Sequence, residues 1–322
     1  MLSRVADALF WMSRYLERAE HVARLLDICF HSEIDLHGVL SGPNELQWTS
    51  LAAILQAPPP TKVSKSSPQV ALSHSLSFDL SNPLSIMSCI SRARYNARGI
   101  RGTISGAIWK ELNKLYWQLS DEAFVREAQQ SPHEYFQAVE TGSHLVQGVC
   151  DATLIHNEGW QFIQLAKFLE RAEKTSRILD IQYHLMYESM DPADLPLSNL
   201  QWAGVLRSCH AYEAYQSLYV GRVEPERVVE FLLLHPSFPR SILFSLESAA
   251  TALSQIEAAG GNRKPSKADR ILGRVLNDLR FGEADQIIHG NLHGFLASVL
   301  ERCAQASSAV QTQYALQSQR SG

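Results

Sequence analysis

The sequence has few charged residues and no long apolar run, and each absence excludes a class of protein. Charged residues make up 19% of the chain, and 29 Lys plus Arg against 33 Asp plus Glu leave a net charge of −4. This balance gives no global field that would hold nucleic acid or an anionic membrane. No apolar run reaches the roughly 18 residues of a membrane helix. We therefore expect neither nucleic acid nor a membrane as a partner.

Cysteine is also scarce, and its spacing indicates a reducing compartment. The five cysteines are odd in number and include no Cys-x-x-Cys pair, which favours neither a disulfide framework nor a cysteine zinc site. The N-terminal stretch MLSRVADALFWMSRYLER is interrupted by charges, so it lacks the apolar core of a signal peptide. These features predict a cytoplasmic protein.

Strand patterns are almost missing, whereas apolar residues spaced by three or four positions recur throughout, so the sequence predicts an all-α multi-helix bundle. The Pro-, Ser- and Lys-rich residues 57–68 should form a loop open to proteolysis, and residues 190–199 should form a second break. Helices are predicted over residues 3–31, 45–56, 69–79, 83–101, 104–119, 121–130, 132–155, 157–189, 198–219, 225–234, 239–258, 265–281 and 291–316.

An internal repeat is the most informative pattern. Residues 15–28 read YLERAEHVARLLDI and residues 168–181 read FLERAEKTSRILDI, with identical residues at nine of 14 positions. Average residue usage would give roughly one identity. We expect one helical domain over residues 1–322 built from two related halves, 1–155 and 156–322. Each half carries one Leu-Glu-Arg-Ala-Glu helix, and the halves should be related by a pseudo-two-fold axis.

The charged residues of the repeat form the candidate site, either as binding groups or as a network of ion pairs. They are Glu17, Arg18, Glu20, Arg24, Asp27, Glu170, Arg171, Glu173, Arg177 and Asp180. One interpretation is a solvated face with intrahelical pairs at i, i+4, such as Glu20 with Arg24. Another is a site in which the arginines hold a carboxylate or phosphate. The catalytic residues, if there are any, are not identified by the pattern.

A third interpretation packs the two repeated helices against each other. Glu17 would then meet Arg171, and Glu170 would meet Arg18, as reciprocal buried pairs. Removing one partner of such a pair would leave a buried charge, so Arg18→Ala and Arg171→Ala should each strongly destabilise the fold.

The four repeated glutamates, Glu17, Glu20, Glu170 and Glu173, are only weakly similar to the carboxylates of di-iron bundles. Those bundles need Glu-x-x-His on two helices, and the repeat instead supplies Glu-x-x-Glu with arginines beside it. His289 and His293 have the i, i+4 spacing of metal ligands without an acid between them, so a structural role is expected. The sequence predicts neither a metal nor a cofactor.

A second basic cluster lies in SRARYNARGIRG. Arg94, Arg98 and Arg101 are spaced i, i+4 and i+7, which places them on one helical stripe, and no acid lies among residues 92–101. The cluster is either an exposed basic helix or an anion-binding site, for example for a phosphate.

The chain resembles the alpha-E family, a bacterial all-helical family named for its Glu-Arg motif. The matching stretches are MLSRVADALFWMSRYLERAEHVARLLD, SRARYNARGIR, HNEGWQFIQLAKFLERAEKTSRILD and AYEAYQSLYVGRVEPERVVEFLLLHPSFPRSILFSLE. The family usually has Glu at the position of Tyr95 and Gly-Arg at the position of Ala166-Lys167, which puts a chemical role for these residues in doubt.

The resemblance implies association with an atypical ATP-grasp ligase, sometimes on the same polypeptide, and with transglutaminase-like proteases. We therefore expect a helical accessory or binding protein that works with an ATP-grasp-type carboxylate–amine ligase in forming or modifying peptide or amide bonds. The alternative is an enzyme acting on an amide or peptide, with the repeated glutamates as general acid or base.

Overall fold

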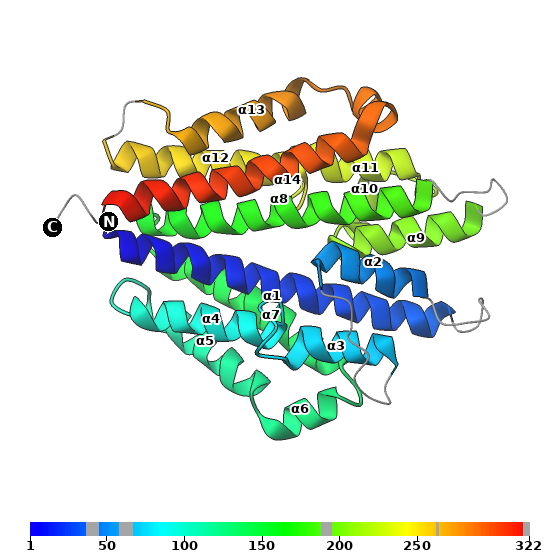
Figure 1. Ribbon diagram of the computed structural model, residues 1–322, viewed down its shortest axis with the longest axis horizontal. Helices are drawn as coiled ribbons and strands as arrows, with labels where there is room; N and C mark the ends of the chain where they lie inside the picture. Colours follow the sequence, from blue (N-terminus) through cyan, green and yellow to red (C-terminus); the bar gives the residue numbers. More distant parts are fainter. Residues whose placement is uncertain (37–44, 58–66, 188–194, 262–263, 318–322) are drawn as a thin grey trace. The chain divides into compact units, whose positions relative to one another are not determined.

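The computed structural model describes all residues except 37–44, 58–66, 188–194, 262–263 and 318–322. Within these described residues the chain forms fourteen α-helices and no strand, which confirms the predicted all-α fold (Figure 1). The helices are α1 (Ser3–Leu36), α2 (Glu45–Leu55), α3 (Pro68–Phe78), α4 (Ile86–Gly99), α5 (Gly106–Leu119), α6 (Glu122–Ala128), α7 (His133–Thr153), α8 (Glu158–Tyr187), α9 (Leu195–Ser208), α10 (Tyr212–Leu218), α11 (Pro225–Leu234), α12 (Ile242–Ala259), α13 (Lys267–Phe281) and α14 (Ala284–Gln317). Among them, none is both long and apolar enough to cross a bilayer.

Two helices differ from the prediction. The helix expected over residues 198–219 is broken between α9 and α10, where His210 has a left-handed φ of 48° that no helix can continue through. The helix expected from residue 291 begins earlier, because α14 contains two helical segments that meet at a kink at Asn291 (φ −154°, ψ 73°). Most of the loop at 57–68 and residues 190–194 of the break at 190–199 lie outside the described residues. Residues 195–199, which were expected to belong to the break, are instead the first residues of α9.

The chain divides into two compact units, Met1–Ile163 and Gln164–Gly322. The division falls inside α8, whereas the sequence places the boundary of the halves at residues 155 and 156, just before this helix begins. The pseudo-two-fold relation between the halves concerns the placement of one unit against the other, and it stays a prediction.

The first unit is a four-helix bundle with three shorter helices around it. Helix α1 packs against α4 and α7, and α5 completes the ring by packing against the same two helices (Figure 1). Gly142 on α7 allows the close approach of α5, because a Cβ atom at this position would lie 2.6 Å from Leu115 Cδ1. The buried face of α1 includes Ala19, Val22 and Leu26, which follow the spacing of three and four that predicted the helix.

The second unit also contains a bundle of helices. Helix α13 packs against α12 and α14. Helix α8 reaches α12 through Phe168 and Phe244, whose ring centroids are 5.8 Å apart, and it reaches α14 through a hydrogen bond of 3.3 Å from the Tyr183 hydroxyl to the Ile288 carbonyl. Helix α8 therefore contacts α12 and α14, the two helices that pack against α13.

A serine begins the second bundle helix of each unit in the same way. Ser85 and Ser241 are N-caps whose hydroxyls accept a hydrogen bond of 3.1 Å from the backbone N–H three residues later. Each hydroxyl also donates to the carbonyl six residues earlier, at 2.7 Å to Asp79 and 2.6 Å to His235. These buried caps satisfy the first turn of α4 and α12 and fix the loops that precede them.

Candidate functional site

In the first unit, the motif glutamates of α1 are buried and bound. The exposed fractions of Glu17, Glu20 and Arg24 are 1%, 0% and 3%. The Arg24 Nε donates to Glu20 Oε1 at 2.9 Å, one turn along the same helix. Glu17 Oε2 accepts a hydrogen bond of 2.8 Å from Gln147 Nε2 on α7. The solvated-face interpretation is therefore wrong for these three residues, because they lie in the interior.

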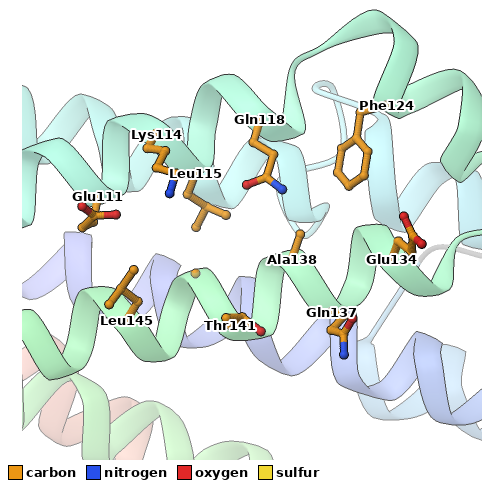
Figure 2. Close-up of a pocket in the computed structure, with 11 residues that line it drawn as sticks. Glu111, Lys114, Leu115, Gln118, Phe124, Glu134, Gln137, Ala138, Thr141 and Leu145 are labelled. Carbon is orange, nitrogen blue, oxygen red and sulfur yellow. The ribbon is translucent and has the colours of Figure 1, made fainter.

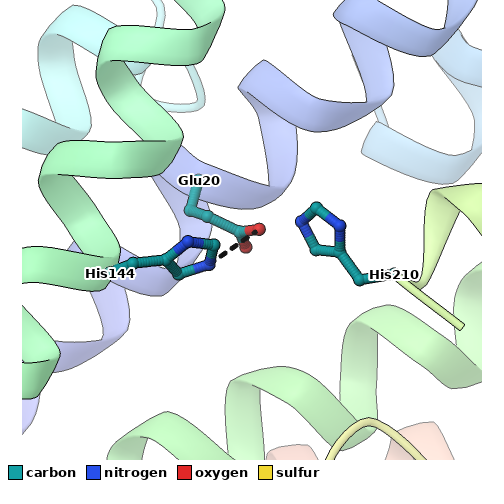
Figure 3. A group of neighbouring side chains, drawn as sticks. All are labelled: Glu20, His144 and His210. Atoms are coloured by element: carbon teal, nitrogen blue, oxygen red, sulfur yellow. Dashed lines mark ion pairs between the residues drawn. The ribbon is translucent and has the colours of Figure 1, made fainter. Parts of the chain in front are cut away.

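A histidine on α7 also approaches this part of α1. His144 Nε2 lies 3.9 Å from Glu20 Oε1, and Figure 3 shows the imidazole pointing at the carboxylate. His144 is about half exposed, whereas Glu20 is buried. Helix α7 therefore presents both Gln147 and His144 to the motif carboxylates, two contacts that the sequence analysis did not identify.

In the second unit the repeated charges are less uniformly buried. Glu170 has no exposed surface, and its Oε1 lies 3.4 Å from Lys174 Nζ one turn later. Arg177, Glu173 and Asp180 are half-buried. Burial lowers the pKa of Arg177, and the negative charges of Glu173, Asp180 and Glu170 oppose that shift. A guanidinium stays protonated in proteins, so Arg177 is a cation among three carboxylates.

The two arginines that follow the first motif glutamate contact an aromatic ring on their own helix. The Arg18 guanidinium lies 5.8 Å from the Tyr15 ring centroid, and the Arg171 guanidinium lies 5.5 Å from the Phe168 ring centroid. Both arginines are half-buried. These are cation–π contacts in equivalent positions of the repeat. The reciprocal pairs of Glu17 with Arg171 and of Glu170 with Arg18 join residues of different units and stay a prediction.

The last repeated position, an aspartate, binds a histidine in each unit. Asp27 Oδ1 accepts a hydrogen bond of 2.8 Å from Nδ1 of His133, the first residue of α7. Asp180 Oδ1 accepts one of 2.6 Å from Nδ1 of His293 on α14. The repeat indicates the aspartates but not His133, which is 106 residues away from Asp27. His289 and His293 are not on one regular turn, because the kink at Asn291 lies between them.

The second basic cluster is not a single helical stripe. Helix α4 ends at Gly99, so Arg101 lies in the following turn rather than on the helix. The ring of Trp109 on α5 nevertheless unites the cluster, since the Arg94 and Arg101 guanidinium groups lie 5.6 Å and 5.4 Å from its centroid. Arg98 is exposed and lies on α4, as Arg94 does.

Helix α5 holds Arg94 in a defined position. Its Nε donates a hydrogen bond of 2.8 Å to Asn113 Oδ1, and its guanidinium lies 4.3 Å from the Tyr116 ring centroid and 5.4 Å from that of Trp117. Trp117 is 59% exposed, and Tyr95 on α4 is 78% exposed. We name Arg94, Tyr95, Arg98, Arg101, Trp109, Tyr116 and Trp117 the arginine–aromatic face. Its aromatic members carry the signal that the sequence analysis overlooked.

A surface groove of about 350 Å³ lies between α5, α6 and α7 (Figure 2). Its lining mixes charged, polar and apolar groups, and the absence of a side chain at Gly142 contributes to its floor. The residues around it are Glu111, Lys114, Leu115, Gln118, Phe124, Glu134, Gln137, Ala138, Thr141, Gly142 and Leu145. The repeated Glu-Arg residues and the three predicted anion-binding arginines do not line this groove.

Comparisons with known proteins place the chain in a family. Residues 1–315 match the Alpha-E family, described as a predicted alpha-helical domain with a conserved ER motif. An uncharacterized protein of Mycobacterium bovis is 23% identical over 325 residues, and uncharacterized proteins of two Mycobacterium tuberculosis strains are 23% and 22% identical. Each alignment covers 94% of this chain and 35% of the relative, so the chain spans about a third of the length of these relatives. No solved structure matches. Because the family match extends over nearly all of its residues, the chain belongs to the Alpha-E family.

Proposed function

We propose that this chain is a helical binding module that acts with an ATP-grasp-type carboxylate–amine ligase in forming or modifying peptide or amide bonds. The observation that carries the proposal is the unequal coverage of the relatives: nearly the whole chain aligns, but with only 35% of each longer polypeptide. This arrangement is expected of a helical domain that is joined to another domain and acts together with it. The ligase itself is what the family resemblance implies.

The arginine–aromatic face is the surface we assign to this partnership. Arg98, Tyr95 and Trp117 are exposed, and Arg94 is held in place by Asn113 and by three rings. Arginine, tyrosine and tryptophan are the residues most enriched at binding hot spots. A face with several guanidinium groups suits an acidic surface of the partner, because opposite charges steer the encounter and fix its orientation.

The alternative, an enzyme with motif glutamates as acid or base, is less well supported. Of the four motif glutamates, Glu17, Glu20 and Glu170 are almost fully buried and Glu173 is half-buried, and none of them lines the groove between α5, α6 and α7. A general acid or base must come within hydrogen-bond reach of its substrate. If these carboxylates do perform the chemistry, the folded double variant Glu17→Gln/Glu170→Gln should lose pathway activity, whereas full activity in that variant would eliminate the mechanism.

The partnership is tested by binding of the full chain to an ATP-grasp-type ligase encoded in the same genome. Co-elution and biolayer interferometry should detect the complex at low salt and, more weakly, near 0.15 M salt, where the screening length is about 8 Å. We expect Arg94→Gln/Arg98→Gln/Arg101→Gln to weaken binding by at least about tenfold, the scale of one hot spot.

A matched control removes the same charge elsewhere. Lys267, Arg270 and Arg274 are exposed on α13 of the second unit, so replacing all three by Gln changes the net charge equally. This control should bind the ligase as the parent does. No co-elution of the parent at either salt concentration would refute the partnership, and equal losses in the two triple variants would refute the assignment of the surface.

A further inference from the structure

Two histidines and one aspartate of the first unit converge where α1 nears its end and α7 begins. The Asp27 Oδ1 atom lies 2.8 Å from His133 Nδ1 and 3.5 Å from His31 Nδ1. One ligand atom from each of the three residues lies within 4.8 Å of the other two. The two imidazoles meet edge to face, with centroids 4.8 Å apart and an interplanar angle of 79°. Both side chains are about half exposed, so an ion could reach them from solvent.

These distances match the dimensions of a metal site. Zinc binds imidazole nitrogen and carboxylate oxygen at roughly 2.0–2.2 Å, so the edges of a tetrahedral site are about 3.4 Å long. The two separations from Asp27 Oδ1, 2.8 Å and 3.5 Å, lie on either side of that value. Two imidazoles and one carboxylate are also the donor set of many divalent transition-metal sites, with the remaining positions filled by water or a ligand.

Hydrogen bonds hold both imidazoles beside Asp27. His133 ties α7 to α1 through the Asp27 carboxylate. His31 Nδ1 lies 2.8 Å from the backbone carbonyl of Asp27, one turn earlier on α1, and 3.5 Å from its carboxylate. These bonds place the three donor groups close together in the chain itself, so an ion would find them already converged.

The same three residue types recur in the second unit. Asp180 corresponds to Asp27 in the repeat, and the sequence places His184 four residues after it, as His31 follows Asp27. His293 on α14 contacts Asp180 as His133 on α7 contacts Asp27. The helices that carry them also correspond: buried Phe136, Val139 and Ser143 follow His133 at the same intervals as buried Leu296, Val299 and Cys303 follow His293.

We propose that Asp27, His31 and His133 bind a divalent transition-metal ion of the Zn²⁺ or Co²⁺ type. The sequence predicts no metal, because the repeat lacks Glu-x-x-His and places arginines beside its glutamates. The metal site does not depend on the partnership with a ligase. An ion at this position would join the late part of α1 to the start of α7.

The experiment titrates the metal-stripped full chain with Co²⁺, followed by visible absorption, and with Zn²⁺, followed by equilibrium dialysis. We expect His31→Gln/His133→Gln to lose one bound ion per chain. The matched control His74→Gln/His156→Gln removes two exposed imidazoles outside this site and should bind as many ions as the parent.

A second measurement separates metal binding from a merely structural role. Zn²⁺ should raise the melting temperature of the parent and of the control, because a ligand of the folded state stabilises it, and the rise should be smaller in His31→Gln/His133→Gln. Unchanged stoichiometry in His31→Gln/His133→Gln would overturn the site. A parent that binds neither ion at submillimolar concentrations would overturn it as well.

Discussion

Replacing Arg24 by methionine tests whether the buried motif charges hold the first unit together. The Arg24 and Glu20 side chains are 4% and 0% exposed, and the atoms that join them are 2.9 Å apart. Methionine keeps an unbranched apolar stem but removes the guanidinium, so the Glu20 carboxylate stays buried without its cation. Breaking a buried pair in this way costs about 3–5 kcal/mol of unfolding free energy. For a unit of this size, each kcal/mol corresponds to about 2–4 °C, so the melting temperature should fall by roughly 6–20 °C.

The chain supplies a matched control for this substitution. Glu122 and Arg126 on α6 have the same order and the same i, i+4 spacing, but their charged atoms are 3.8 Å apart and their side chains are 91% and 70% exposed. Exposed pairs of this kind contribute about 0.3–0.5 kcal/mol. Arg126→Met should therefore leave the melting temperature almost unchanged.

A double-mutant cycle isolates the interaction itself. Glu20→Gln, Arg24→Met and the double variant are unfolded by urea and by heat, with circular dichroism at the helical minimum as the signal. We expect the double variant to be more stable than the sum of the single losses predicts, because it removes both charges of the pair together. The reasoning is refuted if Arg24→Met melts as Arg126→Met does, or if the coupling energy of Glu20 and Arg24 is no larger than that of the exposed pair.

Two substitutions in the first unit, Tyr135→Phe and Gly142→Ala, give three further predictions. The buried Tyr135 hydroxyl has no hydrogen-bond partner among the described residues, so Tyr135→Phe should raise the unfolding free energy by about 1 kcal/mol in urea titrations, and a loss would contradict this assignment. Burial raises the pKa of Tyr135, so the folded state retains the proton that the unfolded chain releases near pH 10. The unfolding free energy of the parent should therefore be lower at about pH 11 than at about pH 8. The same decrease should be smaller in Tyr135→Phe. Gly142→Ala should lower stability by about 1–3 kcal/mol in thermal melts, because the added Cβ meets Leu115. A Cβ added at Gly148 on the same helix meets nothing within 4 Å, so Gly148→Ala should be neutral or stabilising. The opposite order of the two variants would refute the packing argument.

The helices could be predicted closely because their signals are local. Apolar periodicity and the serine and proline residues between segments predicted most helix ends to within a few residues. The break at His210 escaped prediction because neither glycine nor proline marks it, and a left-handed φ of 48° at a histidine depends on the surrounding structure. At Asn291 the preceding Gly290 does mark an irregularity, but it predicted only the start of a helix and not the helical segment of α14 before the kink.

The contacts of the candidate site could not be predicted, because they join distant parts of the chain. Glu17 is bound by Gln147, 130 residues later, and no spacing within the repeat identifies that partner. Periodicity placed Arg101 on a stripe with Arg94, but α4 ends before it, and Trp109 on the next helix brings the two arginines together instead. The sequence therefore identifies the charged positions, whereas the burial of these residues and their hydrogen-bond partners follow only from the three-dimensional fold.

The two copies of the motif show which recurring residues folding alone explains. Burial accounts for Glu17 and Glu170, because a carboxylate in the interior needs polar partners, and Gln147 and Lys174 supply them. Burial does not account for the imidazoles beside the last aspartate of each copy. His133 and His293 are 50% and 68% exposed, and a hydrogen bond at such a surface could come from many other side chains. Two imidazoles beside one carboxylate, His31 and His133 at Asp27, suit a ligand that needs imidazole nitrogen. The end of the Glu-Arg helix, rather than its buried centre, is therefore where we expect the chain to bind an ion.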